Sequence, residues 1–537
     1  MNNSIQISAA DQISQKRRIA ILIGVMTGMF IAALEATIVG TAMPTVIASL
    51  GGLNHYSWVF SAYLVTSTVT VPVWGKLSDL YGRRLLYQIG IGVFLLGTAL
   101  SGFSTSMTQL IIFRAIQGLG AGALVPLGMT IIGDIFSVEE RAKMQAYFSG
   151  VWGLSSIIGP VVGGFITDKL SWQWVFWVNI PVGIVAALII GLAMKDPKPS
   201  AKPTVDYAGA ALLMIAVSVL MLAMVQSGTE SLFNTENIGL FVLAVILLGV
   251  FYFVERRAKD PVIPFDLFKN RTIAIGVGCG FLAGVAMFGA ISFVPLFAQG
   301  VLGFSATRAG SLLTPLMLSW VSMSVVGGRL MLKVSSRTIT IIGFAVLTTG
   351  FVMLSMFNVD SQHFWLYLDL VVIGAGLGLT MLTLLIAVQQ AVERSQLGIA
   401  TSLNQFSRAI GGAIGVAVLG AVLTAGLASQ LSAAATRSGE MTQEQAAEFA
   451  SNPNALIEPT AQASISPSQL HVLREAMGTA MRPVFFVGAI MSLFAFFVSL
   501  LLPAGLGATR ENIDGERMFM AEQTTINARN QPHATDA

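Results

Sequence analysis

The sequence predicts an all-helical integral membrane protein, because the chain is too apolar to fold around a water-soluble core. Hydrophobic residues make up 54% of the 537 residues and charged residues only 11%, whereas a soluble domain carries about 25% charge. A backbone inside lipid must satisfy its own hydrogen bonds, which favours helices here because the alternating pattern of a membrane β-barrel is absent. We therefore expect two six-helix bundles and an inserted two-helix hairpin, with fourteen transmembrane helices in all.

Fourteen apolar segments are each long enough, at about 19 residues or more, to cross the hydrocarbon core. The predicted spans are 19–42, 56–74, 85–103, 108–130, 144–167, 174–194, 207–227, 236–254, 272–298, 308–331, 339–357, 364–388, 400–425 and 480–503. An even number of spans places both termini on one side. If both are cytoplasmic, most Lys and Arg residues fall in cytoplasmic segments, as the positive-inside bias requires. We thus expect a multi-pass protein of the cell (inner) membrane.

The order of the spans predicts the domain organisation. The expected parts are a cytoplasmic N-terminus (1–18), an N-terminal six-helix bundle (19–194), an inserted helix pair (207–254), a C-terminal six-helix bundle (272–503) with an outer loop (426–479), and a cytoplasmic tail (504–537). The polar tail is expected to be disordered. The outer loop is rich in Ala, Ser, Gln and Glu, and a short amphipathic helix is expected near Thr442–Ala450.

Composition also excludes several classes of function. The net charge is only +3 and the basic residues lie in loops, so nucleic-acid binding is not expected. One cysteine, Cys279, and four scattered histidines predict neither a disulfide framework nor a metal site. Gly374–Gly378 lies inside an apolar span without a preceding strand or a P-loop lysine, so no ATP site is expected. We predict no cofactor, no metal and no enzymatic activity.

Glu35 is the strongest single functional candidate, because it lies well inside the first span with apolar residues on both sides. An uncompensated charge there costs about 3 kcal/mol or more, and such residues usually face a cavity and carry function. Removal from water favours the protonated form of a carboxyl group, which suits a proton carrier. The alternative is a structural carboxylate paired with a buried arginine or a hydroxyl group.

The segment Gly75–Arg84 is a dense polar loop between the second and third spans. A loop this short, with three cations and one acid, indicates two helices turning at the cytoplasmic face. After the tenth span, Gly327–Arg329 with Lys333 and Arg337 lies where a second bundle would repeat this loop, although the aspartate is missing. This weak repeat predicts two related bundles that rock about a central site.

Several segments resemble the motifs of the fourteen-span drug:proton antiporters, the QacA/EmrB-like family of the major facilitator superfamily. Gly75–Arg84 is similar to the family's G-x-L-x-D-x-x-G-R-[KR] loop. Leu34–Pro44 is similar to L-D-x-T-I-V-x-x-A-L-P, with Glu35 in place of the aspartate. Arg114–Gly120 is similar to R-x-x-Q-G-x-G, and Gly150–Gly164 resembles the antiporter signature of the fifth span. Weaker matches extend over the whole transmembrane region, at 174–183, 297–303, 374–378 and 405–415.

The resemblance implies a conformational switch at the cytoplasmic face, formed by Gly75, Asp79, Gly82, Arg83 and Asp134. In the family, the aspartate caps the helix that begins the second bundle's fifth span, here near Ile399–Ser402, where a positive helix end is available. The arginine pairs with an acid at the cytoplasmic end of the fourth span, here Asp134. Such a cluster would hold the outward-open state. The alternative is that these charges only set the topology.

The resemblance also implies that Arg114, inside the fourth span, takes part in proton transfer. A buried guanidinium near Glu35 would release the proton of that acid when substrate arrives. Equally, the arginine could form a permanent ion pair that only holds helices together.

The antiporter motif consists of Gly153, Gly159, Pro160, Gly163 and Gly164. Glycines four residues apart allow close helix contact, and a proline bends a helix where it frees a carbonyl group. In the family this motif separates exporters from importers. Plain helix packing is the alternative.

Asp369 is the other acid within a span, near the outer end of the twelfth. It is a candidate second proton or cation site, with partial hydration at the interface as the alternative. Candidate substrate-binding residues are Glu35, Tyr63, Gln117, Phe293 and Gln299, for which ordinary packing is the alternative.

The resemblance predicts proton-coupled efflux (antiport) of amphipathic drugs or toxic compounds, and hence antibiotic resistance. The expected partners are a small cationic or zwitterionic substrate, protons and the lipid bilayer. A monomer is expected, and a periplasmic adaptor could contact loop 426–479. Two alternatives remain: export or flipping of an endogenous lipid or metabolite by the same fold, and a membrane sensor or scaffold without transport.

Overall fold

The computed structural model describes residues 14–50, 56–136, 138–195, 206–227, 235–304, 306–438, 441–451 and 465–503. In these ranges the regular structure is helical, and no strand occurs. The predictions made for most of the N-terminal segment 1–18 and for the whole tail 504–537 lie outside the described residues.

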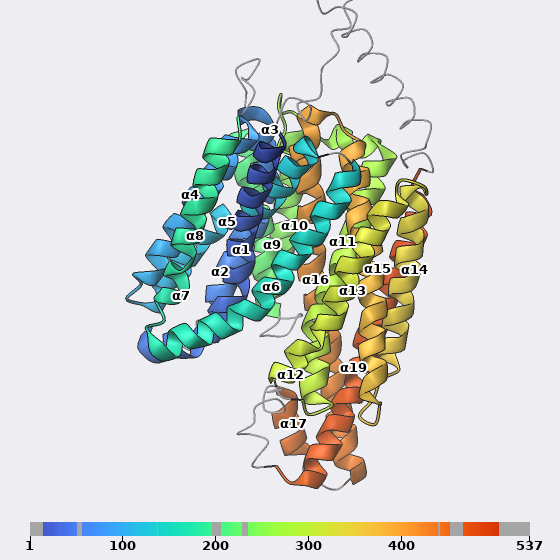
Figure 1. Ribbon diagram of the computed structural model, residues 1–537. Coiled ribbons are helices and arrows are strands. Elements are labelled where there is room, and N and C mark those ends of the chain that lie inside the picture. The colour runs from blue at the N-terminus through green and yellow to red at the C-terminus, as the bar shows by residue number, and fades with distance from the viewer. Residues whose placement is uncertain are drawn as a thin grey trace, which may run out of the picture.

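The helices fall into two halves and an inserted pair (Figure 1). The first half contains α1 (Gln15–Leu50), α2 (Tyr56–Val69), α3 (Val71–Tyr81), α4 (Arg83–Gly102), α5 (Met107–Ile135), α6 (Val138–Lys169), α7 (Trp174–Trp177) and α8 (Asn179–Ala193). The inserted pair is α9 (Tyr207–Ser227) and α10 (Thr235–Glu255), followed by the short 3-10 helix η2 (Phe265–Lys269). The second half contains α11 (Arg271–Gly300), α12 (Ala306–Ser311), α13 (Leu313–Leu330), α14 (Ser336–Ser355), α15 (His363–Gln390), η3 (Arg394–Gln396), α16 (Leu397–Ser438), α17 (Gln443–Ser451) and α19 (Pro467–Ser499).

Within the described residues, twelve helices are long and apolar enough to cross a membrane. They correspond to twelve of the fourteen predicted spans. Of the other two, 56–74 is divided between α2 and α3, with Pro72 just inside the start of α3, and 144–167 lies within α6. The all-helical membrane fold is confirmed, and the count of fourteen spans stays a prediction.

The same packing pattern occurs in both halves, which supports the predicted duplication. In the first half α5 packs against α2 and α4, and α1 packs against α6 and α8. In the second half α15 packs against α13 and α14, and α11 packs against α16 and α19. The halves meet through α3 against α16 and through α6 against α13, which are equivalent contacts in the two halves. In Figure 1 the two halves lie side by side and come together at the end that carries α3.

Three glycines at alternate positions occur in α5 and again in α15, and they explain why these two helices have equivalent packing partners in the two halves. In α5, a Cβ added to Gly118 would lie 2.5 Å from the backbone oxygen of Tyr63 in α2. In α15, a Cβ added to Gly374 would lie 2.2 Å from the backbone oxygen of Leu316 in α13. Gly120 and Gly376 similarly face α4 and α14. Small residues let helix backbones approach closely in membranes, so each triplet seats its helix between two neighbours.

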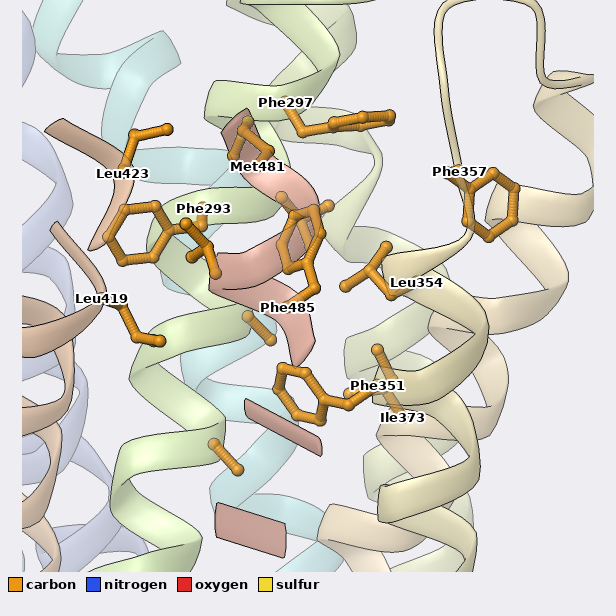
Figure 2. Packing of buried hydrophobic residues seen from close by; sticks show 14 of the residues in the cluster. Phe293, Phe297, Phe351, Leu354, Phe357, Ile373, Leu419, Leu423, Met481 and Phe485 are labelled. Atoms are coloured by element: carbon orange, nitrogen blue, oxygen red, sulfur yellow. The ribbon is translucent and has the colours of Figure 1, made fainter. Parts of the chain in front are cut away.

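Apolar side chains fill the second half between α11, α14, α15, α16 and α19. Figure 2 shows part of this cluster, in which Phe293 lies between Leu419 and Leu423 and Phe485 lies near Leu354. The rings of Phe297 and Phe485 pack edge to face with centroids 5.9 Å apart, an arrangement that aromatic rings favour.

The inserted pair packs against both halves through α9, which contacts α2 and α16. Leu213 and Val217 of α9 share an apolar cluster with Val69 of α2 and Leu403 of α16. The observed helices agree with the predicted bounds of 207–254 within one or two residues.

Within the outer loop expected at 426–479, the described residues are largely helical, which corrects the sequence-based prediction of a loop. α16 continues without a break to Ser438, and α19 begins at Pro467, well before the predicted span at 480. Buried Leu427, Leu431 and Met477 give these extensions an apolar core. The short helix expected near Thr442–Ala450 is present as α17.

Candidate functional site

Glu35 and Arg114 form an ion pair inside the first half of the molecule. Glu35 lies in α1 and is completely buried, and Arg114 lies in α5 and is 1% exposed. The Arg114 Nη1 atom donates to Glu35 Oε1. Each charge would be costly alone in this setting, and pairing with hydrogen bonds offsets the cost.

Two amides extend the pair into a network that joins four helices. Asn179 at the start of α8 donates from Nδ2 to Glu35 Oε2 over 2.7 Å. Arg114 Nη1 donates to Gln117 Oε1 over 2.6 Å, and Gln117 Nε2 donates to Thr98 Oγ1 in α4 over 2.7 Å. Asn179, Gln117 and Thr98 are fully buried. Both carboxylate oxygens of Glu35 therefore have a donor.

Arg114 has further partners that do not depend on Glu35. Its Nε donates to the backbone oxygen of Val59 over 3.3 Å. Its guanidinium lies 4.3 Å from the ring centroid of Tyr63 and 6.0 Å from that of Phe176, within the range of cation–π attraction. The arginine thus keeps favourable contacts if Glu35 loses its charge.

The antiporter motif packs directly on the helix that carries Glu35. A Cβ added to Gly159 in α6 would lie 2.1 Å from Thr37 Oγ1, two residues after Glu35 in α1. Thr37 Oγ1 also donates to the backbone oxygen of Ser155 over 3.0 Å. Pro160 lies within α6, and Gly163 is buried. Gly153 and Gly164, in contrast to Gly159, have no atom of the described residues within 4 Å of an added Cβ.

A second polar cluster lies where α3 meets α16. Asp79 accepts hydrogen bonds from the backbone amides of Gly398 over 2.9 Å and Ile399 over 2.8 Å. It also pairs with Arg83, whose Nε lies 3.1 Å from Asp134 Oδ2 at the end of α5. The contacts that the resemblance implied for Asp79 and Arg83 are present. Their role as a switch stays a prediction.

Two glycines shape this cluster. A Cβ added to Gly75 would lie 2.3 Å from Ser402 Oγ and 2.9 Å from the backbone oxygen of Gly398, so only a glycine lets α3 approach α16 this closely. Gly82 has φ 100° and ψ 151°, a conformation open essentially only to glycine. It ends α3 and begins α4, which places Arg83 beside Asp79 and Asp134.

The structure does not place Asp369, Phe293 or Gln299 beside Glu35. Asp369 in α15 is fully buried, and neither of its carboxylate oxygens has a hydrogen-bond partner among the described residues. Partial hydration therefore does not explain this acid in the observed conformation. Phe293 packs in the apolar core of the second half (Figure 2), and Gln299 donates to the oxygen of Pro295 in its own helix. Tyr63 and Gln117, in contrast, contact Arg114.

Sequence reasoning missed Asn179 and Thr98 as members of the network. Asn179 did carry a signal, since an amide in an apolar span beside Trp177 and Pro181 needs a buried partner. Thr98 carried none, because a threonine in a membrane helix can bond its own backbone.

Comparisons with known proteins agree with this architecture. The model of the Major Facilitator Superfamily matches residues 25–416. The chain is 38% identical over 499 residues to the multidrug transporter protein MdtP of Bacillus subtilis (strain 168), covering 92% of each chain. It is 35% identical over 483 residues to multidrug resistance protein 3 of the same strain, covering 90% of this chain and 94% of the relative.

A solved structure supports the fold independently. The crystal structure of the human organic anion transporter MFSD10 (TETRAN) covers 90% of this chain and 100% of its own, with a TM-score of 0.56 at 15% identity. At that identity the likeness concerns the fold alone. The family model, these relatives and the helical architecture together show that the chain belongs to the Major Facilitator Superfamily, a family of membrane transporters rather than enzymes.

Proposed function

We propose that this protein is a drug:proton antiporter that exports amphipathic compounds across the cytoplasmic membrane and takes up protons in return. The observation that carries the proposal is the buried network of Glu35, Arg114, Gln117 and Asn179. A titratable acid in the membrane interior is by default a functional site. The relatives named as multidrug proteins support drugs as the cargo.

The contacts of Arg114 suggest how one proton can break the ion pair. A proton on Glu35 removes the negative charge and with it the strongest attraction to the guanidinium. Arg114 then retains Gln117, the Val59 oxygen and the Tyr63 ring. The Arg114 guanidinium therefore still has partners when Glu35 is protonated. Without these contacts, loss of the Glu35 charge would leave a buried cation unpaired.

Proton exchange requires a different conformation from the one observed, because Glu35 is completely buried here. Thr37 couples Glu35 to α6 through its contact with Gly159, and α6 packs against α13 of the other half. A change in the charge of Glu35 can thus alter how α1 and α6 seat against the second half. The cluster around Asp79 would hold the halves together at the cytoplasmic face until that change occurs.

The finer assignments belong to the same proposal. The protein would be a fourteen-span, QacA/EmrB-like exporter in which α2 with α3, and α6, provide the remaining two spans. Both termini would be cytoplasmic, and the protein would act as a monomer. Asp369 would be a second proton site, since a buried carboxyl group without partners is far less costly neutral than ionised.

The test uses purified protein in liposomes with an imposed pH gradient and a panel of cationic and zwitterionic dyes and drugs. Glu35→Gln should abolish proton-driven efflux and substrate-induced proton release while the protein still folds. Glu35→Asp, which restores the acid of the family motif, should keep part of both. Unchanged proton release in Glu35→Gln would contradict the assignment.

The same liposomes separate the alternatives. Flipping of a labelled lipid without transport of any dye or drug would favour lipid export. Binding without any proton flux would favour a sensor or scaffold.

A further inference from the structure

Arg408 is a second arginine in the membrane interior, and no role has been assigned to it so far. It lies eleven residues after the start of α16, about 16 Å along the helix and therefore near the middle of a hydrocarbon core of about 30 Å. Its side chain is half-buried. The contact that its Nη1 atom makes is with Met381 Sδ in α15, over 3.8 Å. A thioether is only a weak acceptor.

No acid balances this charge among the described residues. None of the ion pairs there includes Arg408, and α11 and α16 contain no acidic residue. The acid of α15, Asp369, lies twelve residues from Met381, which is about 18 Å along the helix. Asp79 is engaged at the first residues of α16. An uncompensated guanidinium at this depth is costly and marks a functional site.

Arg408 lies on the face of α16 that is directed towards α15. Thr401 in α16 bonds Gln389 in α15 over 3.1 Å, and seven residues later Arg408 meets Met381 in the same helix. These contacts define a seam between α15 and α16. Gln389 also faces α5, since a Cβ added to Gly133 would lie 3.2 Å from its Nε2. Arg408 therefore lies on the side of α16 that faces α15, two turns beyond the point where Gln389 approaches the first half.

A second unsatisfied donor lies one turn from Arg408. Asn404 is 4% exposed, and its Nδ2 has no hydrogen-bond partner in the part of the chain that the structure describes. One turn beyond Arg408, the ring of Phe288 lies against Gly412. Among the described residues, the acceptor that Arg408 contacts is a weak thioether and Asn404 Nδ2 has none. Two such donors, beside an aromatic ring, suit a ligand that combines an anionic group with an apolar body.

We infer that Arg408 and Asn404 bind the carboxylate of an amphipathic aromatic compound in the transport path. Arg408 supplies the charge-assisted hydrogen bonds, which are the stronger ones. This deepens the proposed function and rests on it, because it names aromatic carboxylates, zwitterions included, as a substrate class. In such a zwitterion the cationic end would remain free to approach the first half.

The experiment compares naphthoate with its neutral amide as ligands of the purified protein, in detergent and in chloride-free buffer. The readouts are the thermal midpoint and the Kd from equilibrium dialysis. Naphthoate should bind more tightly than naphthamide and raise the midpoint further. In Arg408→Gln the Kd for naphthoate should weaken roughly tenfold or more, as expected for loss of a charged hydrogen bond, and the difference between acid and amide should vanish. Arg408→Lys should keep part of the difference between acid and amide.

The matched control is Arg437→Gln, because Arg437 is an exposed arginine in the last turn of the same helix, α16. It should behave like the unaltered protein. Equal binding of acid and amide by the unaltered protein would overturn the inference. So would an undiminished preference for the acid in Arg408→Gln, or an equal Arg408-dependent midpoint shift with chloride alone, which would assign the site to an inorganic anion.

The empty protein provides a readout that does not depend on any ligand. If Arg408 has no acidic partner, Arg408→Gln should leave the midpoint unchanged or raise it. A large fall would show that the guanidinium holds the fold together, and would also overturn the inference.

The binding assay is independent of proton coupling. Glu35→Gln should lose proton release but keep its preference for naphthoate over naphthamide. Loss of proton coupling in the unaltered protein would thus contradict the proposed function without touching this site. Loss of the acid preference would contradict this site alone.

Discussion

Asp79 and Gly398 join the two halves of the molecule, because the Asp79 carboxylate in α3 accepts the backbone amide of Gly398 at the first turn of α16 over 2.9 Å. The next amide, of Ile399, donates to the same carboxylate. A helix N-terminus has unpaired amides and a partial positive charge, so a carboxylate satisfies both. The contact exists only while α3 lies against α16.

Asp79→Asn should therefore shift the protein away from the observed conformation. An amide can still accept one backbone hydrogen bond but loses the charge and the pairing with Arg83. A hydrogen bond to a charged group contributes about 1.5–3 kcal/mol, so the population of the opposite conformation should rise roughly tenfold or more. The measurement is the distance distribution between spin labels placed on the two halves at the end that carries α3.

Asp266→Asn is the matched control. Asp266 is an exposed acid in η2 that is paired with Lys269 at i+3. The hydrogen bond from Lys269 lowers the pKa of Asp266, so the control also removes a full charge. Asp266 does not link the two halves, so this variant should leave the distances between the spin labels unchanged. Equal distributions in the two variants would show that Asp79 does not hold the halves together.

The single variant Arg114→Gln should be far less stable than the double variant that carries both Arg114→Gln and Glu35→Gln. The single change leaves a fully buried carboxylate without its cation, which costs about 3–5 kcal/mol in buried pairs. Neutralising both residues removes that cost. Unfolding of all four forms in a double-mutant cycle measures the coupling. Additive effects would indicate that the two side chains do not form a pair in the membrane.

Gly159→Ala should disrupt the packing of α6 against α1, and Gly164→Ala should not. The added Cβ would lie 2.1 Å from Thr37 Oγ1 at the first position, whereas nothing lies within 4 Å at the second. Overpacking of this kind costs about 1–3 kcal/mol. We expect a lower thermal midpoint and reduced transport only for Gly159→Ala. A similar loss in both variants would indicate a general requirement for glycine in this helix.

Much of the fold could be predicted from the sequence, because spans depend on local hydropathy. The inserted pair α9 and α10 was found within one or two residues. The helical extensions of α16 and α19 were missed, since 426–438 and 467–479 are too polar to register as spans. Their helices are held by a tertiary core around Leu431 and Met477 that hydropathy does not reveal.

The site was predictable only in part. Glu35 and Arg114 stand out as charges in apolar segments, so their functional interest follows from solvation cost alone. Asn179 could not be assigned to Glu35, because 144 residues separate them and only the packing of α8 on α1 brings them together. Arg408 was visible as an intramembrane arginine, but coordinates were required to show that no acid among the described residues pairs with it.

Gly82→Ala should weaken the cluster of Asp79, Arg83 and Asp134 without touching any of its charges. At φ 100° and ψ 151° an alanine is strained by about 1–3 kcal/mol, and relief of that strain would turn Arg83 away from Asp79 and Asp134. We expect a lower thermal midpoint, together with the shift in label distances that Asp79→Asn produces. Gly92→Ala, at an exposed position in α4 with nothing within 4 Å of an added Cβ, is the control and should change neither. A lower midpoint with unchanged distances would show that Gly82 only stabilises the turn, and that the position of Arg83 does not set which conformation is populated.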